Sequence, residues 1–387
     1  MPERLSCDVA IVGGGLSGAL IALALKKRRP DISLRLIEST ARIGGNHIWS
    51  FFSGDIAQDD RWLIAPLISY GWTGYDVHFP AHSRGLKQNY YSIESERLDT
   101  VVRATLAPHE LITQAHVLGA SARAVVLGEG ERIEAKGVID CRGAGDLGLL
   151  DCGWQKFVGM EFDLADAHDL ARPIVMDAQV EQIDGYRFVY CLPFAATRMF
   201  IEDTYYSDTP DIDRAALRGR IEAYARARGW GWDRVLRAEA GALPVVMSGD
   251  FEAYWKSGGN RIAKAGMRGG LFHPLTGYSL PDAVRSAALV ARQSDLSGTA
   301  LHDLLHGLAR QTWKARGFYR MLTKMLFRAS EPEARYRILE RFYRLDAGLI
   351  ARFYAGEATL LDQGRVLTGK PPVPIGRAIE AILGTKR

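Results

Sequence analysis

Residues 8–38, DVAIVGGGLSGALIALALKKRRPDISLRLIE, decide the fold of this chain. Val9–Val12 is an apolar run typical of a buried parallel strand, and it leads into Gly13-x-Gly15-x-x-Gly18 and an apolar helix. The first glycine of this pattern permits a tight turn, the second lets the backbone approach a pyrophosphate, and the third lets helix and strand pack closely. The stretch therefore predicts a Rossmann-type dinucleotide-binding unit; the alternative is a glycine turn in an ordinary strand–helix unit.

An acid closes the second strand of this unit. Residues 33–37 form the predicted strand, and Glu38 follows it, twenty residues after Gly18. A carboxylate there can accept a hydrogen bond from a ribose hydroxyl, while the free N–H groups at the start of the helix face the phosphates. We expect a dinucleotide cofactor to be held by Gly13, Gly14, Gly15, Leu16, Ser17, Gly18 and Glu38.

The uncharged run over residues 9–25 also resembles a signal peptide or a short membrane-spanning helix. It is too short and too rich in glycine to cross a bilayer comfortably. The strand and acid that follow fit only the nucleotide-binding interpretation. We therefore expect neither export nor a transmembrane helix.

Composition limits the class of protein. A chain of 387 residues with 47% hydrophobic content can bury a large core across two or three domains. Its net charge of +4 is mild, and no nucleic-acid partner is expected. The cysteines form no CxxC pair and have no metal-ligand spacing, which favours reduced thiols, a reducing compartment and no metal site over a disulfide. They are Cys7, Cys141, Cys152 and Cys191.

Later segments indicate that the nucleotide domain is discontinuous. A helix is expected at 98–106, followed by strands between 111 and 135 with turns at Gly119 and Gly128–Gly130, and an apolar strand at 137–143 that re-enters the nucleotide sheet. Strand-like segments then fill residues 157–201. The remaining expected helices lie at 211–228, at 281–292 (beginning with a proline) and over most of the chain from residue 301.

We therefore predict an α/β protein made of a Rossmann-type domain, an inserted antiparallel-sheet domain and a helical C-terminal part. The Rossmann domain comprises residues 1–60, 95–150 and 260–295. The strand-rich domain, expected to bind the substrate, comprises residues 61–94 and 151–259. The helical part comprises residues 296–387.

Two glycine-rich segments outside the first unit are candidate binding sites. Residues 44–52, GGNHIWSFF, combine tight backbone at Gly44 and Gly45 with aromatic residues for a wall, or they form a core loop. Residues 266–283, GMRGGLFHPLTGYSLPDA, offer a second place where backbone can approach an anionic or flavin-ring ligand. His273 in that segment is either a base or a structural histidine.

Residues 200–207, FIEDTYYS, place two adjacent carboxylates at the end of an apolar strand. Neighbouring side chains of a strand point to opposite faces of its sheet. Only one of Glu202 and Asp203 can therefore face a buried site. Taken alone, such a pair is typical of a solvated strand end.

Together, these segments resemble the bacterial lycopene β-cyclases. The strings GGGLSG, GGNHIWSFF, SERLD (residues 95–99), VIDCRG, FIEDTYYS and GLFHPLTGYSLP occur in this order over nearly the whole chain. GGNHxWSF and GLFHPxTGYS are specific to that family, whereas many flavoproteins share the first fingerprint. The resemblance implies an aromatic-hydroxylase-like flavoprotein fold, FAD used in its reduced form with NAD(P)H as the expected reductant, and a carotenoid substrate dissolved in a lipid bilayer.

The resemblance also assigns site residues. It implies a catalytic carboxylate in FIEDTYY, which carries over to Glu202 as the acid, or as the base that finishes the reaction, with Asp203 supporting it. Further expected cofactor contacts are Gly44, Gly45, Arg97, Gly143, Gly277 and Tyr278. Expected substrate contacts are Trp49, Phe51, Phe52, Phe272 and His273.

Lycopene cyclisation is redox-neutral and requires an acid strong enough to protonate an alkene in a dry site. A buried carboxyl with a raised pKa can hold that proton at neutral pH. Two other functions suit the same nucleotide motif: an NAD(P)H-dependent flavin monooxygenase or prenyl-chain reductase, and a non-enzymatic escort protein for lipid or prenylated cargo. The motif set favours the cyclase.

A basic helix is expected within residues 308–330. Arg316, Arg320, Lys324 and Arg328 recur every four residues, opposite an apolar face. Such a helix suits the surface of an anionic membrane, although a surface helix packed on its own domain has the same pattern. We expect a peripheral protein on the cytoplasmic face of a membrane.

Overall fold

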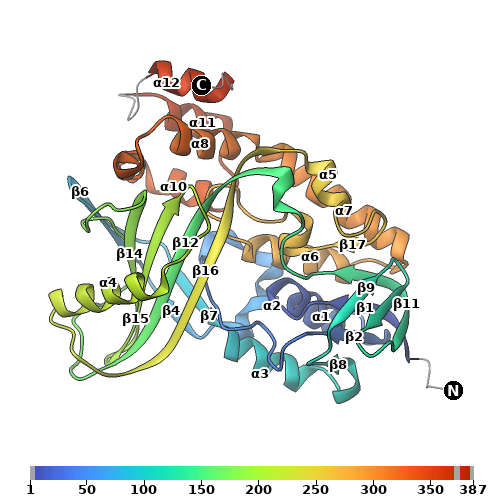
Figure 1. Ribbon diagram of the computed structural model, residues 1–387. Helices are drawn as coiled ribbons and strands as arrows, with labels where there is room; N and C mark the ends of the chain where they lie inside the picture. Colours follow the sequence, from blue (N-terminus) through green and yellow to red (C-terminus); the bar gives the residue numbers. More distant parts are fainter. Residues whose placement is uncertain (1–4, 370–374, 384–387) are drawn as a thin grey trace.

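The computed structural model describes residues 5–369 and 375–383. Two large sheets lie side by side, and helices from the last third of the chain cover one end of them (Figure 1). The first sheet has the strand order β8-β2-β1-β11-β10-β9, with β17 paired to β11. The second has the order β16-β12-β15-β14-β13-β5-β6. A small three-stranded sheet, β3-β7-β4, completes the set.

The first sheet is the predicted Rossmann sheet. Its parallel core consists of β1 (Leu5–Val12), β2 (Leu34–Ile37), β8 (Leu111–Ile112), β11 (Arg132–Asp140) and β17 (Ala263–Lys264). An antiparallel extension follows, made of β9 (Val117–Ala120) and β10 (Ala124–Leu127). Its helices are α1 (Leu16–Arg28), α2 (Arg61–Ile64), α3 (Ser95–Thr105), α5 (Phe251–Lys256), α6 (Leu280–Ala291) and α7 (Gly298–Ala315).

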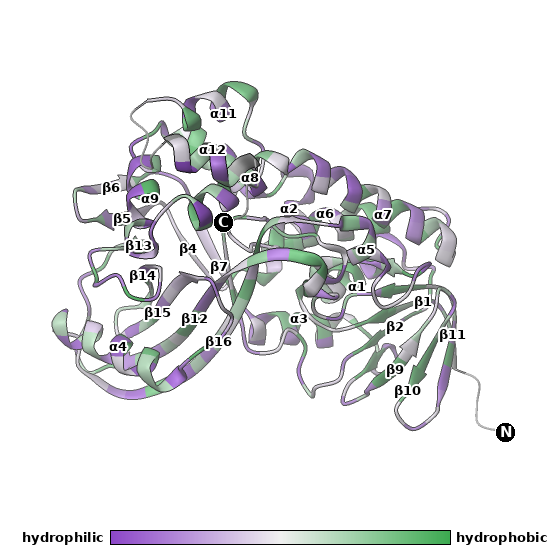
Figure 2. Ribbon diagram, turned by 45° about the horizontal axis from the view of Figure 1, so that its top comes forward, coloured by the Kyte–Doolittle hydropathy of each residue, from purple (hydrophilic) through white to green (hydrophobic). Residues whose placement is uncertain are grey.

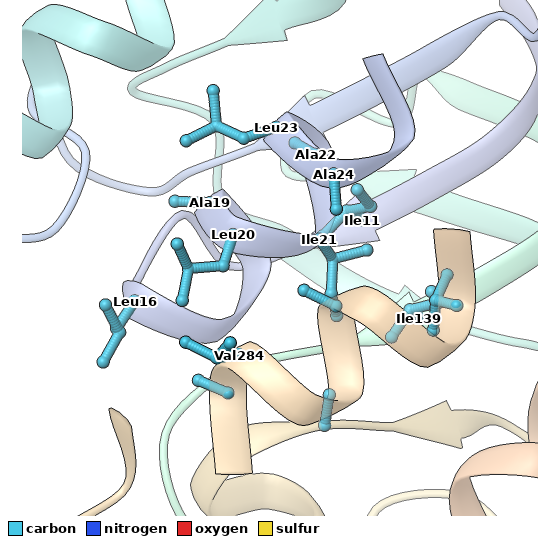
Figure 3. Close-up of a cluster of buried hydrophobic side chains, with 14 of the residues drawn as sticks. Ile11, Leu16, Ala19, Leu20, Ile21, Ala22, Leu23, Ala24, Ile139 and Val284 are labelled. Carbon is cyan, nitrogen blue, oxygen red and sulfur yellow. The ribbon is translucent and has the colours of Figure 1, made fainter. Parts of the chain in front are cut away.

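Helix α1 lies at the centre of this domain because every residue from Leu16 to Leu25 is buried. A helix that is apolar all round is stable only when other elements surround it, and here β1, β11 and α6 do so. Figure 3 shows Ile11 of β1, Ile139 of β11 and Val284 of α6 beside the α1 side chains. The proline near the start of α6 lies where the sequence predicted it.

The first and third fingerprint glycines have the structural roles that their spacing predicts. Gly13 has a φ of +100°, which favours a residue without a side chain. A β-carbon on Gly18 would lie 2.0 Å from the carbonyl oxygen of Gly13, so only glycine allows α1 to pack this closely. A β-carbon on Gly15 would meet nothing within 4 Å, so space is left open above the start of the helix.

The second sheet is antiparallel except for the parallel pair β13–β5. Its strands are β5 (Tyr75–Phe79), β6 (His82–Leu86), β12 (Leu150–Leu164), β13 (Ile174–Asp177), β14 (Tyr186–Ala195), β15 (Arg198–Ser207) and β16 (Trp232–Gly249). Helix α4 (Arg214–Ala227) packs on its outer face (Figure 1). The small sheet consists of β3 (Ile48–Phe52), β4 (Tyr70–Trp72) and β7 (Tyr90–Glu94).

Three expectations about the strands need correction. Gly119 lies within β9, and the turn follows it because the Ser121 hydroxyl accepts the backbone N–H of Ala124. Strand β15 runs on to Ser207, so the two carboxylates of FIEDTYYS lie in mid-strand and not at a solvated end. The long strand β16 was not foreseen; pairing along the whole of β12 holds it in place.

The C-terminal helices are α8 (Gly317–Arg328), α9 (Tyr336–Phe342), α10 (Ala347–Tyr354), α11 (Leu360–Leu367) and α12 (Ile375–Leu383). Of these, α8, α9 and α10 bury aromatic and aliphatic side chains against the antiparallel sheet, in a core that includes Tyr75 and Val245. The region is helical, as the sequence predicted. Part of the predicted 296–387 segment, residues 370–374 and 384–387, lies outside the described residues.

Cations of the predicted basic stripe contact other parts of the protein, and the expected membrane contact of this helix stays a prediction. Arg316 is buried and forms a salt bridge with Asp282, and its guanidinium also donates to the carbonyl of Phe272. The guanidinium of Arg320 stacks 4.0 Å from the ring centre of Trp313, and Arg328 pairs with Asp151 at 3.1 Å. These contacts fasten the region of α8 to α6, α7 and β12.

Over the described ranges, no helix combines the length and apolarity needed to cross a membrane. The same residues contain no group of three or more His, Cys, Asp or Glu side chains that could hold a metal ion. All four cysteines are free thiols.

We predict that replacing Gly18 by alanine and replacing Gly15 by alanine have different effects on stability and on nucleotide binding. Gly18→Ala should lower the free energy of unfolding by about 1–3 kcal/mol, because its methyl group collides with the Gly13 carbonyl. Gly15→Ala should cost less than about 1 kcal/mol and instead weaken nucleotide binding, since its methyl group projects into open space. Thermal melts of the nucleotide-free proteins test this; equal melting temperatures for the two variants would contradict it.

Candidate active site

A cavity of about 760 Å³ lies between the two large sheets. The β1–α1 loop, the end of β2 and the segments around residues 44–50, 141–143 and 276–281 line one end of it. The inner face of the antiparallel sheet lines the other end. The cavity therefore joins the predicted nucleotide site to the strand-rich domain.

The nucleotide end brings together most of the residues predicted to hold a cofactor. Its lining includes Gly13, Gly15, Leu16, Ser17, Glu38, Gly44, Gly45, Gly143, Gly277 and Tyr278. Gly14 lies beside it and donates its backbone N–H to a Glu38 carboxylate oxygen at 2.8 Å. Gly18 packs against the Gly13 carbonyl and does not itself line the cavity.

Two local features fit a bound dinucleotide. The Ser17 hydroxyl is buried and has no hydrogen-bond partner in the protein, although it belongs to a residue that lines the cavity. Such an orphaned polar group calls for a ligand or water. The carboxylate of Glu38 is held by the backbone N–H groups of Gly14 and Thr40, at the strand end where a ribose hydroxyl would lie.

Arg97 is not in this cavity, which corrects its predicted role. It is exposed on α3 and donates to the carbonyl of Pro66. The SERLD string acts on the loop before β3 instead: Ser95 accepts the N–H of His47, and Asp99 accepts the N–H of Ile43. A different arginine lines the cavity. Arg142, in the string VIDCRG, is held there by a bidentate pair with Asp140.

Glu202 lines the other end of the cavity, on the inner face of β15. Its carboxyl accepts a hydrogen bond from the Thr204 hydroxyl at 2.7 Å. Burial, together with the negative charge of Glu239, raises the pKa of Glu202 from 4.5 to about 8. The group is therefore predominantly protonated at neutral pH.

Asp203 points to the opposite face of the same strand and does not support Glu202. Arg187 grips its carboxylate with two hydrogen bonds of 2.9 and 3.0 Å, and the Tyr205 hydroxyl adds a third at 3.1 Å. Asp203 is fully buried under α4, away from the cavity lining. Strand alternation thus separates two adjacent carboxylates into a cavity residue and a structural residue.

The sequence reasoning missed a second cavity carboxylate, Glu239 of β16. It is 7% exposed, and its Oε2 atom accepts the backbone N–H of Ile48 at 3.2 Å and lies 3.6 Å from Nδ1 of His47. The signal was present, because Glu239 is an acid within the small and apolar run AEAGALPVV. It was overlooked because that run was not recognised as a strand.

The predicted substrate aromatics are divided between cavity and core. Trp49 lines the cavity, together with aromatic residues that the sequence did not single out: Phe157, Phe188, Tyr190, Tyr206 and Tyr354. Phe51, Phe52 and Phe272 are instead almost completely buried in hydrophobic cores, and the cavity lining does not include them. They pack the fold and do not form a substrate wall.

His273 is a structural histidine. Its Nδ1 atom accepts the backbone N–H groups of Leu275 and Thr276, each at 3.3 Å, and so shapes the LTGYS turn. Burial and the nearby Arg316 cation hold the pKa of His273 well below 6.5, which keeps its ring neutral. It is not part of the cavity lining.

Known proteins of similar sequence agree with the predicted resemblance. Residues 8–380 match the family described as "Lycopene cyclase protein". The lycopene beta-cyclase of Pantoea ananas is 43% identical over 98% of this chain and 99% of its own length. The lycopene beta-cyclase of Paracoccus sp. (strain N81106 / MBIC 01143) is 42% identical over 97% of each. A chloroplastic lycopene beta cyclase of Arabidopsis thaliana is 23% identical over 73% of this chain.

Solved structures with the same architecture carry names of other activities, and one is described as a probable FAD-dependent monooxygenase, PqsL from Pseudomonas aeruginosa, with a TM-score of 0.58 at 17% identity over 87% of this chain. A geranylgeranyl bacteriochlorophyll reductase-like protein from Thermoplasma acidophilum matches 98% of this chain with a TM-score of 0.64 at 13% identity. The p-nitrophenol 4-monooxygenase PnpA from Pseudomonas putida DLL-E4 matches 95% with a TM-score of 0.62 at 16% identity. These likenesses confirm the predicted fold class. The sequence matches establish the family: the chain belongs to the lycopene cyclase proteins.

Proposed function

We propose that this protein is an FAD-dependent lycopene β-cyclase, which closes the acyclic ends of lycopene into β-ionone rings without net redox change. One observation carries this proposal beyond the family assignment. Glu202, a carboxyl that stays protonated at neutral pH, lies in the same cavity as a dinucleotide cradle. An alkene has no polar handle, so a cyclase needs such an acid, whereas hydride or oxygen transfer does not.

The residues present fit FAD. The Gly13–Gly18 loop and the start of α1 would hold its phosphates, Glu38 its ribose, and the backbone around Gly277 and Gly44 its ring. Reduced FAD, when bound, supplies negative charge in a low-dielectric cavity where positive charge develops. NAD(P)H is the proposed reductant, and cyclisation would not consume it stoichiometrically, since no electrons leave.

The chain itself supplies the proton and the dry surroundings. Glu202, which lines the cavity, would protonate C2 of a terminal C1=C2 bond, which leaves a tertiary cation at C1. The C5=C6 bond attacks this cation and closes the ring, and loss of the C6 proton gives the β-ring. Phe157, Phe188 and Tyr206 line the cavity and limit the access of water, which would quench the cation.

Aromatic faces near the acid stabilise the cation further. Tyr190 and Trp49 line the cavity, and a desolvated cation over such a ring gains about 2 kcal/mol. The hydroxyl of Tyr190 is bonded to that of Tyr90 at 2.7 Å, which fixes the ring in position. A rigid ring offers its face without reorganising during the reaction.

Two other functions remain as alternatives. A flavin monooxygenase or prenyl-chain reductase has the same fold and would consume NAD(P)H in proportion to product. An escort protein for lipid cargo would need no protonated carboxyl. The environment of Glu202 favours the cyclase over both.

A hydrocarbon substrate implies a membrane surface, and the structure offers a different candidate for that contact from α8. Leu360 and Leu361, at the start of α11, are 84% and 87% exposed, and Leu367 near its end is 49% exposed. Arg365 on the same helix is also exposed. Helix α11 lies at the outer edge of the helical part (Figure 2). Apolar side chains flanked by a cation suit an anionic bilayer surface.

We predict that Glu202→Gln abolishes ring formation while FAD remains bound, because an amide cannot donate a strongly acidic proton. Asp203→Asn is the matched control on the same strand. It should lower stability by about 3–5 kcal/mol by leaving Arg187 unpaired, yet still cyclise at temperatures where it is folded. Product chromatography from lycopene in liposomes with reduced FAD measures both. An active Glu202→Gln enzyme would remove this carboxyl from the mechanism.

The rate should also depend on pH. Because the acid form of Glu202 is required and its pKa is about 8, activity should hold below that pH and fall as the pH rises through 8. Tyr190 and Tyr278, which also line the cavity, stay protonated over this range because burial raises the pKa of each. A pH–rate profile of the wild type and of Asp203→Asn checks this; activity that keeps rising to pH 10 would contradict it.

For the membrane contact, we predict that Leu360→Glu combined with Leu361→Glu strongly reduces sedimentation with anionic liposomes. FAD binding should not change, because neither residue lines the cavity. Leu118→Glu is the control, since Leu118 is a 63% exposed leucine on β9 of the other sheet. Equal liposome binding by the two variants would argue against α11.

A further inference from the structure

Glu202 and Glu239 occupy one row of the antiparallel sheet. Gly159 of β12 pairs with Glu202 of β15 on one side and with Glu239 of β16 on the other. Directly opposed residues point to the same face of a sheet, so both carboxyl side chains leave it on the cavity side. Both residues line the cavity. Two strand spacings, about 10 Å, separate their Cα atoms.

The residue between the two carboxyls has no side chain. A β-carbon on Gly159 would lie 2.3 Å from Cζ of Phe200, so the phenyl ring of Phe200 lies over the glycine. Phe200 is 1% exposed. At Gly159, strand β12 therefore places no polar side chain between the two acids.

The two carboxyls have different surroundings. Glu202 has one hydroxyl donor, Thr204, and its side chain is kept neutral by burial and by the charge of Glu239. Glu239 receives the backbone N–H of Ile48, and His47 lies 3.6 Å away. The Thr204 hydroxyl thus contacts one carboxyl, while a backbone N–H and an imidazole lie against the other. Two carboxyls with different partners on one face of a cavity can divide the roles of acid and base.

Cyclisation needs both kinds of group. It adds one proton at C2 and removes one from C6, so no net proton is consumed. A single carboxyl would have to reach both carbon atoms within one turnover. A second carboxyl on the same face of the cavity removes that requirement.

On the basis of the proposed function, we propose that Glu239 is the base that removes the C6 proton after Glu202 has protonated C2. The O–H bond of Glu202 breaks as the C2–H bond forms, and the C5=C6 electron pair then forms the C1–C6 bond. The C6–H bond breaks, its electron pair becomes the ring double bond, and the proton goes to Glu239. Release of this proton from Glu239 and uptake of another by Glu202 restore the starting state.

Replacement of the base tests this assignment, because the C5 cation has other protons to lose. In Glu239→Gln, β-ring formation should fall by about 10²–10⁴-fold. The cation should then lose a proton from C4 or from the methyl group on C5, which gives isomeric rings, or revert to lycopene. In D2O the reversion leaves deuterium at C2 of recovered lycopene. Glu202→Gln should show neither isomeric rings nor exchange.

Two further variants complete the design. Glu239→Asp keeps a carboxyl and should recover part of the β-ring yield. Glu161→Gln removes another buried acid from β12, one that pairs with Arg198 and does not line the cavity, and should form only β-rings. Bound FAD, read from its absorbance, reports that each variant is folded. The products are separated by chromatography, and deuterium is located by mass spectrometry.

The outcomes separate this proposal from the proposed function. A wild-type protein that forms no ring with reduced FAD would overturn the function itself. An active wild type together with a Glu239→Gln variant that forms β-rings at the wild-type rate would overturn only the role of Glu239. A folded Glu239→Gln variant without isomeric rings and without exchange would also overturn it, because a base acts after protonation.

Discussion

The burial of one carboxyl between two sheets is the constraint on which the rest of this structure depends. Glu202 holds its proton at neutral pH because it is removed from water and lies near a second negative charge. Neither sheet alone produces that environment. The Rossmann sheet supplies the cofactor cradle, the antiparallel sheet supplies the carboxyl, and the cavity exists only where the two meet. The protonation state of Glu202 therefore depends on the packing of the two sheets against each other.

The antiparallel sheet shows how a strand sorts similar residues into different roles. Glu202 and Asp203 are neighbours in the chain, yet one faces the cavity and the other forms a buried pair with Arg187 on the far side. In the next row but one, Phe157 lies over Gly241 as Phe200 lies over Gly159, because a β-carbon on Gly241 would be 2.8 Å from its ring. Glycines at these two positions leave room for the phenyl rings that cover them.

The C-terminal helices show that a periodic pattern can predict a helix face but not the residues that pack against it. Four cations recurring every four residues indicate a basic face, and that face exists on α8. The pattern does not show that Asp282, Trp313 and Asp151 lie opposite it and engage three of the four cations. Exposed leucines lie three helices further on, in α11, although no periodicity marked them.

The sequence by itself determined the nucleotide fold and the family, because glycine spacing, strand–helix order and rare motif strings are local and can be recognised without knowledge of packing. It also singled out Glu202, which lines the cavity. Gly277 and Tyr278, which the sequence indicated as cofactor contacts, line the cavity. Tertiary structure alone decided which face of β15 meets the cavity, that Arg97 lies outside it while Arg142 lines it, and that Phe51, Phe52 and Phe272 are core residues. It also brought Glu239, from a strand that had gone unrecognised, into one row with Glu202. These outcomes depend on contacts between segments far apart in the chain, which no local pattern encodes.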